Sequence, residues 1–169
     1  SDKAHQELQK ICTANIKKEI GKCTYTHMLN TDGGIETDLT VVCIDNNHFR
    51  IISSAATRER DKFHIRKHLA DDIDLIDVTD DYCVFGLFGP KSRELMKTLS
   101  NNNFDNEEFK FGTAKYIQIN GINIWAQRLS YVGELGYELY VKFNQSKKIY
   151  ESLIEKGKDF NLSNCGMHA

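Results

Sequence analysis

The sequence predicts an α+β fold in which mostly antiparallel sheets are flanked by helices. Short segments that alternate apolar and polar residues follow one another across turn residues, which is typical of antiparallel strands. Helix-like segments separate groups of these strands instead of alternating with single strands, which argues against parallel βαβ units. We expect about eight strands and about four helices.

The clearest element is a β-hairpin in the first third of the chain. Asp32-Gly33-Gly34 separates the apolar run 25–29 from the strand that follows, and glycine accepts the positive φ of a tight turn. Because side chains alternate across a strand, one face is expected to join the core: Ile35, Thr37, Leu39, Val41 and Cys43. The other face is mixed and suits either a solvated surface or a pocket wall: Glu36, Asp38, Thr40 and Val42.

The other elements follow from the same patterns. Helices are expected near residues 5–16, 57–69 and 145–156, and a further helix is expected to have Pro90 at its first position. Strands are expected at 48–55, 74–78, 81–89, 111–119, 122–132 and 137–143. Polar residues 101–108 read as a loop, so we expect one domain over 1–169 with a soft subdomain boundary near 101–108.

Composition and charge exclude several classes of protein. With 169 residues, 40% of them hydrophobic, the chain is long enough to bury a core. A net charge of −2 argues against nucleic-acid binding, which depends on a positive field over phosphates. No apolar run is long enough to span a membrane, and no signal-peptide pattern occurs. We therefore expect a cytoplasmic protein, or a mitochondrial-matrix protein in a eukaryote.

The cysteines and histidines do not predict a metal site. The five cysteines are odd in number, far apart and without a C-x-x-C pair, so they are expected to be reduced. His64 and His68 are four residues apart, a spacing that places two ligands on one helix face. No acidic third ligand lies at a recognisable offset. A solvated helix face is the preferred interpretation, and metal binding is the alternative.

Three stretches carry a resemblance to a known family. They are YTHMLNTDGGIETDLTV, FGLFGPKSRELMKTL and RLSYVGELGYELYV, and they occur in this order over nearly the whole chain. Together they resemble the folate-binding aminomethyltransferase (glycine-cleavage T-protein) family, and most closely the folate domain fused to dimethylglycine and sarcosine dehydrogenases. The resemblance implies a T-protein-like folate-binding domain truncated at both ends. We expect such a fragment to be inactive by itself.

The resemblance assigns the catalytic role to Asp38. In the family, an essential aspartate follows a glycine pair and heads a D-L-x-V strand, and Asp38 is the matching residue. Its implied role is to accept a hydrogen bond or proton from the folate amine, which keeps the nitrogen lone pair available for attack on an iminium carbon. The alternative is a surface acid at a strand edge, which remains the interpretation for Glu36.

Five further residues are implied to bind folate. Glu134 matches the family glutamate that grips the pterin, a task that suits a carboxylate because the aminopyrimidine edge offers two parallel N–H donors. A solvated hairpin acid is the alternative for Glu134. Tyr25 is expected to stack on the ligand, with a core tyrosine as the alternative. Tyr131 and Arg128 flank Glu134, and Ser54 stands where many glycine-cleavage members place an asparagine.

The implied function is tetrahydrofolate-dependent transfer of a one-carbon (aminomethyl or iminium) unit that forms 5,10-methylenetetrahydrofolate. It would belong to a dimethylglycine or sarcosine dehydrogenase-like enzyme or to a glycine-cleavage T-protein. FAD is expected only in a fused or associated flavin oxidoreductase domain outside this chain, since no G-x-G-x-x-G occurs here. Two alternatives on the same scaffold are a non-catalytic folate-binding regulatory module and a folate-dependent demethylase.

Overall fold

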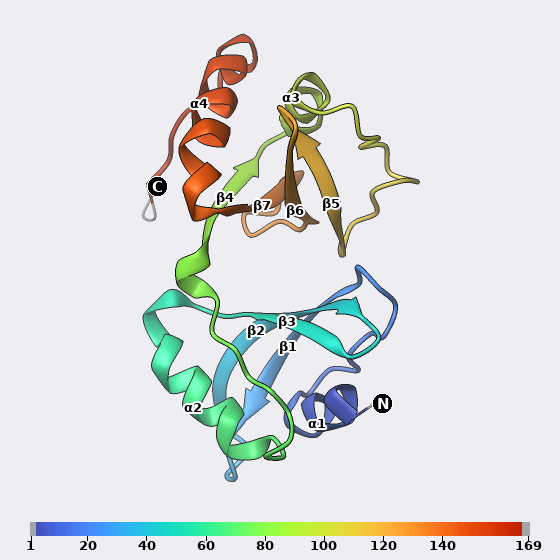
Figure 1. Ribbon diagram of the computed structural model, residues 1–169, viewed down its shortest axis with the longest axis vertical. Coiled ribbons are helices and arrows are strands. Elements are labelled where there is room, and N and C mark those ends of the chain that lie inside the picture. The colour runs from blue at the N-terminus through green and yellow to red at the C-terminus, as the bar shows by residue number, and fades with distance from the viewer. Residues whose placement is uncertain (1–2, 167–169) are drawn as a thin grey trace. The chain divides into compact units, whose positions relative to one another are not determined.

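The computed structural model describes residues 3–166 and divides the chain into two compact units, Ser1–Asp77 and Val78–Ala169 (Figure 1). Each unit has its own antiparallel sheet, helices and hydrophobic core. The units part after Asp77 and not near 101–108. Residues 101–108 lie inside the second unit, because the fully buried Phe104 ties that loop to the second core.

The first unit is a three-stranded sheet with two helices. Its elements are α1 (Lys3–Ile11), β1 (Cys23–Leu29), β2 (Ile35–Asp45), β3 (His48–Ile52), the 3-10 turn η1 (Ala55–Thr57) and α2 (Arg58–His68). The strands lie in the order β1-β2-β3, and both pairs are antiparallel. The predicted hairpin is confirmed, with Gly33 at a φ of +81° in its turn.

The core of the first unit lies between one face of its sheet and the two helices (Figure 1). Its buried apolar members are Leu8, Cys12, Ile16, Met28, Leu39, Val41, Ile65 and Leu69. The predicted core face of β2 is confirmed from Thr37 to Cys43. Ile35 is the exception at 66% exposure, because the β1–β2 register shifts between Met28 and Leu29 and the alternation fails there.

Two predicted elements of the first unit differ in the structure. The first helix ends at Ile11, before Ile16, because the backbone turns there to bond with β1: Thr13 N donates to His27 O at 3.0 Å. Residues 74–78 form no strand. Side-chain contacts hold that segment instead. Leu75 packs against the core, and Asp77 Oδ2 forms an ion pair with Arg58 Nε of α2 at 2.7 Å.

The second unit is a four-stranded antiparallel sheet with two helices. It begins with the 3-10 turn η2 (Thr79–Asp81), and its strands are β4 (Tyr82–Phe88), β5 (Thr113–Ile119), β6 (Ile122–Arg128) and β7 (Gly136–Lys142). Its helices are α3 (Ser92–Leu99) and α4 (Ser146–Gly157), with short 3-10 turns at Phe143–Gln145 and Lys158–Phe160. The strand order is β4-β7-β6-β5, so β7 inserts between the first strand and the β5–β6 hairpin.

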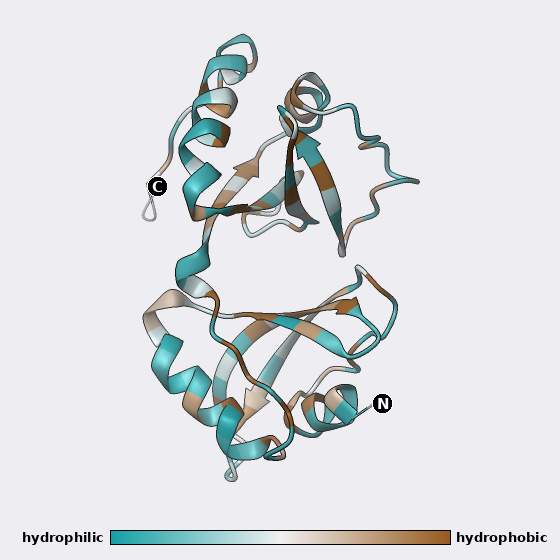
Figure 2. Ribbon diagram, in the orientation of Figure 1, coloured by the Kyte–Doolittle hydropathy of each residue, from teal (hydrophilic) through white to brown (hydrophobic). Residues whose placement is uncertain are grey.

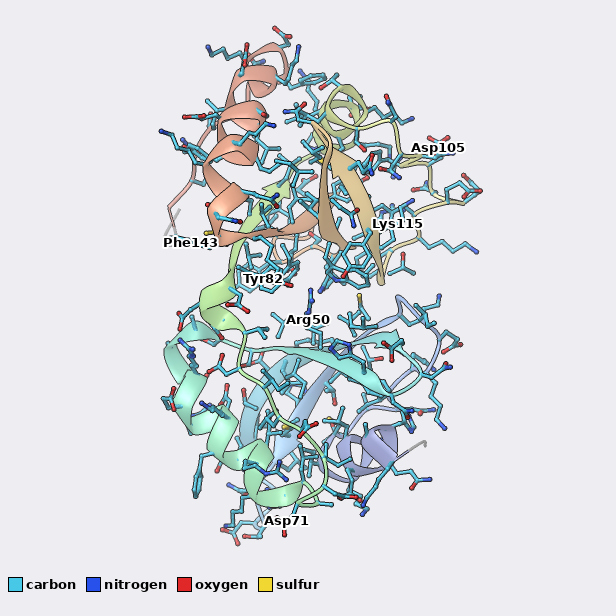
Figure 3. All side chains as sticks on the ribbon, in the orientation of Figure 1. Arg50, Asp71, Tyr82, Asp105, Lys115 and Phe143 are labelled. Carbon is cyan, nitrogen blue, oxygen red and sulfur yellow. The ribbon has the colours of Figure 1, made fainter. Side chains whose placement is uncertain are left out.

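Apolar residues of the second unit gather on its strands and on the inner faces of its helices, whereas the outer helix surfaces are hydrophilic (Figure 2). Tyr137 of β7 lies against Phe104 and Phe109, with both pairs of ring centroids 5.6 Å apart. The loop that carries these phenylalanines and Asp105 runs beside β5, where Lys115 Nζ donates to Asn103 O at 2.8 Å (Figure 3). The predicted polar loop therefore contributes to the core.

Helix α3 begins two residues after Pro90, which lies in the preceding turn and not at the first helical position. Across residues 3–166, the structure contains no helix that is both long enough and apolar enough to cross a membrane.

Candidate functional site

Tyr25 and Asp38 meet on the exposed face of the first unit's sheet. Tyr25 Oη donates a 3.0 Å hydrogen bond to Asp38 Oδ2, across the β1–β2 ladder. Both side chains are exposed, and Tyr25 retains 61% of its accessible surface. The hydrogen bond to Asp38, followed by partial burial and the charge of Asp38, raises the pKa of Tyr25 above its ordinary value. The phenol therefore stays protonated and remains a donor to the carboxylate at neutral pH.

His27 completes a cluster on this face. It is the Cα partner of Asp38 in the ladder, and its ring stands edge-on to Tyr25 with the centroids 5.4 Å apart. No sequence motif points to His27. The hairpin register could have predicted that His27 lies beside Asp38, because residues 25 and 27 share a face of β1 and a tight turn at 32–34 places that face beside Asp38.

Ser54 and Glu36 lie in the same unit but outside this cluster. Ser54 is exposed and precedes η1, where its carbonyl accepts from Thr57 N at 3.1 Å. Glu36 is half-buried on β2, and its charge acts on His64 of α2. Burial, followed by the neighbouring charge of His68, outweighs Glu36 and lowers the pKa of His64. Neither Ser54 nor Glu36 forms a hydrogen bond or ion pair with Asp38 in the described part of the chain.

In the second unit, Glu134 and Tyr131 lie in the loop between β6 and β7. Both are exposed, Tyr131 at 91%, and within residues 3–166 the Glu134 carboxylate accepts no side-chain hydrogen bond. Gly133, directly before Glu134, has a φ of +79°, which favours glycine. The Glu134 carboxylate is therefore presented by a defined turn and is free to accept donors from a ligand.

The β4–α3 turn holds the end of this loop in place. Leu135 O accepts a 2.8 Å hydrogen bond from Gly89 N and a 3.2 Å hydrogen bond from Ser92 Oγ. The Phe88 ring packs so closely over Gly136 that a β-carbon there would overlap it. Two of the stretches that carry the family resemblance, FGLFGPKSRELMKTL and RLSYVGELGYELYV, thus meet at this point. Their joint occurrence has a packing reason.

Arg128, at the end of β6, is tied to a neighbouring segment and not to Glu134. Its Nη1 donates to Phe109 O at 2.6 Å, and its own carbonyl accepts from Gly112 N at 2.9 Å. No ion pair between Arg128 and Glu134 occurs among the residues that the structure describes. Arg128 therefore supports the loop through the 109–112 segment.

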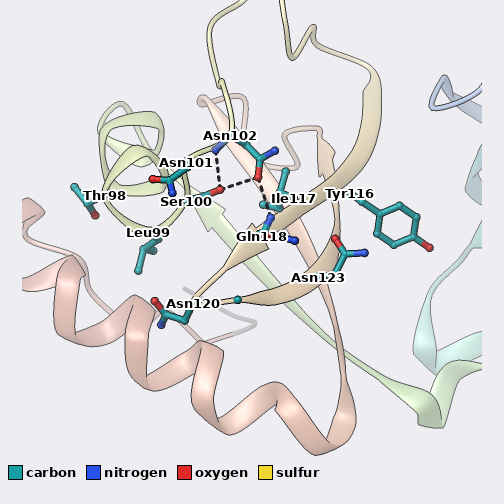
Figure 4. Close-up of a pocket in the computed structure, with 11 residues that line it drawn as sticks. Thr98, Leu99, Ser100, Asn101, Asn102, Tyr116, Ile117, Gln118, Asn120 and Asn123 are labelled. Atoms are coloured by element: carbon teal, nitrogen blue, oxygen red, sulfur yellow. Dashed lines mark hydrogen bonds between the residues drawn. The ribbon is translucent and has the colours of Figure 1, made fainter.

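A cavity of about 540 Å³ lies at the far end of the β5–β6 hairpin (Figure 4). It contains none of the predicted site residues and is lined mainly by amides and hydroxyls, among them Asn101, Asn102, Gln118 and Asn123. Asn102 Oδ1 accepts from Ser100 Oγ at 3.0 Å and from Gln118 N at 2.9 Å, so its amide caps the edge of β5. The cavity is distinct from the Glu134 loop.

The described residues contain no group of three or more histidine, cysteine, aspartate or glutamate side chains arranged to hold a metal ion. His64 and His68 do share a face of α2, with ring centroids 4.6 Å apart. His68 Nδ1 lies within hydrogen-bond distance of His64 O, at 2.8 Å, so this ring nitrogen already has a backbone partner. The five cysteines are unpaired by disulfides.

Solved structures share this fold. The glycine cleavage system aminomethyltransferase T from Bartonella henselae superposes with a TM-score of 0.72 at 19% identity, over 88% of this chain and 40% of that one. A heterotetrameric sarcosine oxidase from Corynebacterium sp. U-96 superposes with a TM-score of 0.71 at 13% identity, over 97% of this chain and 77% of that one. At these identities the likeness concerns the fold.

Sequence relatives cover nearly all of the chain. An aminomethyltransferase from Halothermothrix orenii is 32% identical over 98% of this chain and 46% of its own length. The mitochondrial dimethylglycine dehydrogenase of Homo sapiens is 28% identical over 92% of this chain and 18% of its own length. The chain thus spans less than half of these relatives. The GCVT N-terminal domain family matches residues 2–169, and the chain belongs to this family.

Proposed function

We propose that the chain binds tetrahydrofolate and takes part in moving a one-carbon unit onto it, with 5,10-methylenetetrahydrofolate as the product. Tetrahydrofolate supplies the amine nitrogen that accepts the carbon. The observation that carries the proposal is the 3.0 Å hydrogen bond from Tyr25 Oη to Asp38 Oδ2 on an exposed sheet face. An aminomethyltransferase and a dimethylglycine dehydrogenase among the relatives support the reaction class.

The pair on the first unit provides a proton acceptor of fixed orientation. Tyr25 occupies Asp38 Oδ2, while Asp38 Oδ1 has no hydrogen-bond partner within residues 3–166. Oδ1 is therefore the oxygen assigned to accept the proton of the folate amine, which keeps the nitrogen lone pair available. The exposed Tyr25 ring offers a stacking surface beside that oxygen.

Glu134 is assigned to the pterin ring. Its carboxylate has two oxygens free of side-chain partners in the described chain, which matches the two parallel N–H donors of an aminopyrimidine. The turn at Gly133 and the bonds to Leu135 O fix the direction of approach. Tyr131 is assigned to the same ligand because it is the most exposed of the large hydrophobic side chains in the second unit.

The donor of the carbon is proposed to be a methylated amine oxidised by a flavin domain outside this chain. A dimethylglycine dehydrogenase and a 4-methylaminobutanoate oxidase (formaldehyde-forming) from Paenarthrobacter nicotinovorans, 30% identical over 95% of this chain, support this choice. An aminomethyl-lipoyl carrier is the second donor to be assayed, because other relatives are aminomethyltransferases.

Asp38→Asn tests the function in the complete protein that contains this chain, because the chain alone is expected to be inactive. The amide keeps the shape of the side chain but lowers its basicity, so transfer from the amine should fall by about 10²-fold or more. Tetrahydrofolate affinity, measured by calorimetry, should change little. Unchanged transfer with intact binding would remove Asp38 from the catalytic role, and folate binding without any transfer by the unaltered protein would leave a non-catalytic folate-binding module. Release of 5-methyltetrahydrofolate by the unaltered protein would instead indicate a demethylase.

A further inference from the structure

A buried carboxylate on α2 joins the helix to the strand that carries Asp38. Asp61 is 2% exposed, and its Oδ2 accepts from Thr57 Oγ1 at 2.7 Å and from Thr37 Oγ1 at 3.1 Å. Its Oδ1 accepts from Arg60 Nε at 3.2 Å and Nη2 at 3.1 Å, and Ser53 donates as well. A buried carboxylate is costly unless donors surround it, and here donors come from four segments of the unit.

The first residues of β2 need this support because the sheet is incomplete beside them. β3 pairs with β2 only from Thr40 to Asp45, so residues 35–39 have β1 as their single ladder neighbour in the described chain. Even that ladder is irregular between Met28 and Leu29. Where β3 would continue, the chain leaves the sheet toward α2. The bond from Thr37 to Asp61 takes the place of the missing strand.

Thr37 and Asp38 point to opposite faces of β2. Thr37 is 5% exposed and bonds to Asp61 on the core side, while Asp38 bonds to Tyr25 on the exposed side. A rotation of this strand segment would break one bond or stretch the other. We infer that Asp61, acting through Thr37, is a positioning residue that holds the Asp38 carboxylate against Tyr25. The catalytic meaning of that position rests on the proposed function, whereas the mechanical coupling does not.

Two matched variants separate positioning from general stability. Thr37→Val and Thr57→Val each remove one hydroxyl donor from the same Asp61 oxygen, but only Thr37 lies on β2. The two variants should lower the unfolding midpoint by similar amounts. Thr37→Ser keeps a hydroxyl and should behave like the unaltered chain.

The readout is the Tyr25 phenol, followed by NMR in protein labelled with carbon-13 at the tyrosine ring and assigned with Tyr25→Phe. Thr37→Val should move the pKa of Tyr25 down toward its ordinary value of 10.0, because the bond to Asp38 loosens. Thr57→Val should leave the pKa of Tyr25 unchanged. Equal shifts in both variants, or a shift in neither, would overturn the inference and leave Asp61 a stabilising residue only.

Two further measurements complete the test. If Thr37→Val does not fold, Asp61→Asn takes its place, and the same fall in the Tyr25 pKa is expected. In the transfer assay, Thr37→Val should lower the rate at saturating folate by about tenfold to a hundredfold with little change in folate affinity. If Thr37→Val lowers the pKa of Tyr25 but Asp38→Asn has no effect on transfer, the proposed function is contradicted and the positioning role of Asp61 stands.

Discussion

The two units present their candidate carboxylates in opposite ways. Asp38 lies on strand β2, between a phenol donor on one face and a buried hydrogen-bond network on the other. Glu134 lies in a loop, exposed and without a side-chain partner in the described chain. The first carboxylate is restrained through its own contacts. The second is restrained only through the backbone that carries it.

This difference matches the two proposed tasks. A proton acceptor must keep one oxygen in a fixed direction, and small displacements of such a group are costly to the rate. A carboxylate that grips a planar ring receives its final orientation from the ring's two parallel donors, so it needs free oxygens more than a fixed rotamer. Changes to the loop backbone should therefore act mainly on folding stability, and changes to the Glu134 side chain mainly on folate affinity.

The largest effect on stability is expected from Gly136→Ala. A β-carbon at this position overlaps the Phe88 ring, with Phe88 Cε1 only 2.7 Å away and Leu129 O at 3.1 Å. We expect the second unit to lose about 3 kcal/mol of stability. Urea unfolding followed by fluorescence measures it, because the single tryptophan, Trp125, is 4% exposed on β6.

Phe88→Ala supplies the control for that prediction. Removing the ring removes the overlap, so Gly136→Ala should cost much less in this background than in the unaltered chain, as a double-mutant cycle would show. If Gly136→Ala lowers stability just as much in the Phe88→Ala background, the close packing of Phe88 does not explain why position 136 requires glycine.

The next largest effect is expected on folate binding, from Glu134→Gln. The amide has the same shape but replaces a charge-assisted pair of hydrogen bonds, so the dissociation constant for tetrahydrofolate should rise by about tenfold to a hundredfold. Calorimetry measures the change, and Trp125 fluorescence shows that the unit stays folded. Glu107→Gln, at another exposed acid of the same unit, is the matched control. Equal affinities in the two variants would remove Glu134 from the site.

The sequence predicted the regular elements well because their signals are local. The hairpin around Asp32-Gly33-Gly34 and the alternation from Thr37 to Cys43 both follow from neighbouring residues. Residues 74–78 have the same kind of local pattern and were wrongly predicted as a strand, since a strand also needs a pairing partner and no described strand pairs with them. Ladder pairing is a long-range property that a single segment does not contain.

The site was predicted only in part for the same reason. The motifs predicted Asp38 and Glu134, whose roles stay predictions, while the neighbours of Asp38 in the structure, His27 and Asp61, were not predicted. Helix α2 reads as a charged, solvated helix in sequence, and Asp61 is buried only because Thr37, Ser53 and Thr57 converge on it from other segments. The unit boundary after Asp77 was also missed, because no change in composition marks it.

A smaller loss of stability, confined to the first unit, is expected when the pH is lowered. Burial by itself would raise the pKa of Asp61, but the hydrogen bonds from Thr57, Thr37, Arg60 and Ser53 outweigh burial and lower it below the ordinary 3.8. The ionised carboxylate therefore stabilises the fold above about pH 4, and this contribution is lost as the pH falls through the lower folded value. Asp61→Asn should cost about 2 kcal/mol at pH 7.

The pH dependence distinguishes this cause from a general loss of packing. The stability difference between Asp61→Asn and the unaltered chain should narrow steadily below about pH 4. Far-UV circular dichroism follows the whole chain, and Trp125 fluorescence follows the second unit alone. A difference that stays constant with pH, or that appears in the fluorescence transition, would contradict the assignment to Asp61.

The smallest effect is expected from Gly133→Ala, in the loop that precedes Gly136. A β-carbon at Gly133 meets no atom within 4 Å, so the only cost is the positive φ of +79° in a residue that has a side chain. That cost is about 1 kcal/mol, and it should appear in the Trp125 unfolding curve as a fraction of the Gly136→Ala effect. Folate affinity should fall by no more than a few-fold, because the Glu134 carboxylate itself is unchanged. A loss of affinity as large as that of Glu134→Gln would show that the turn, and not the free carboxylate, sets the strength of binding.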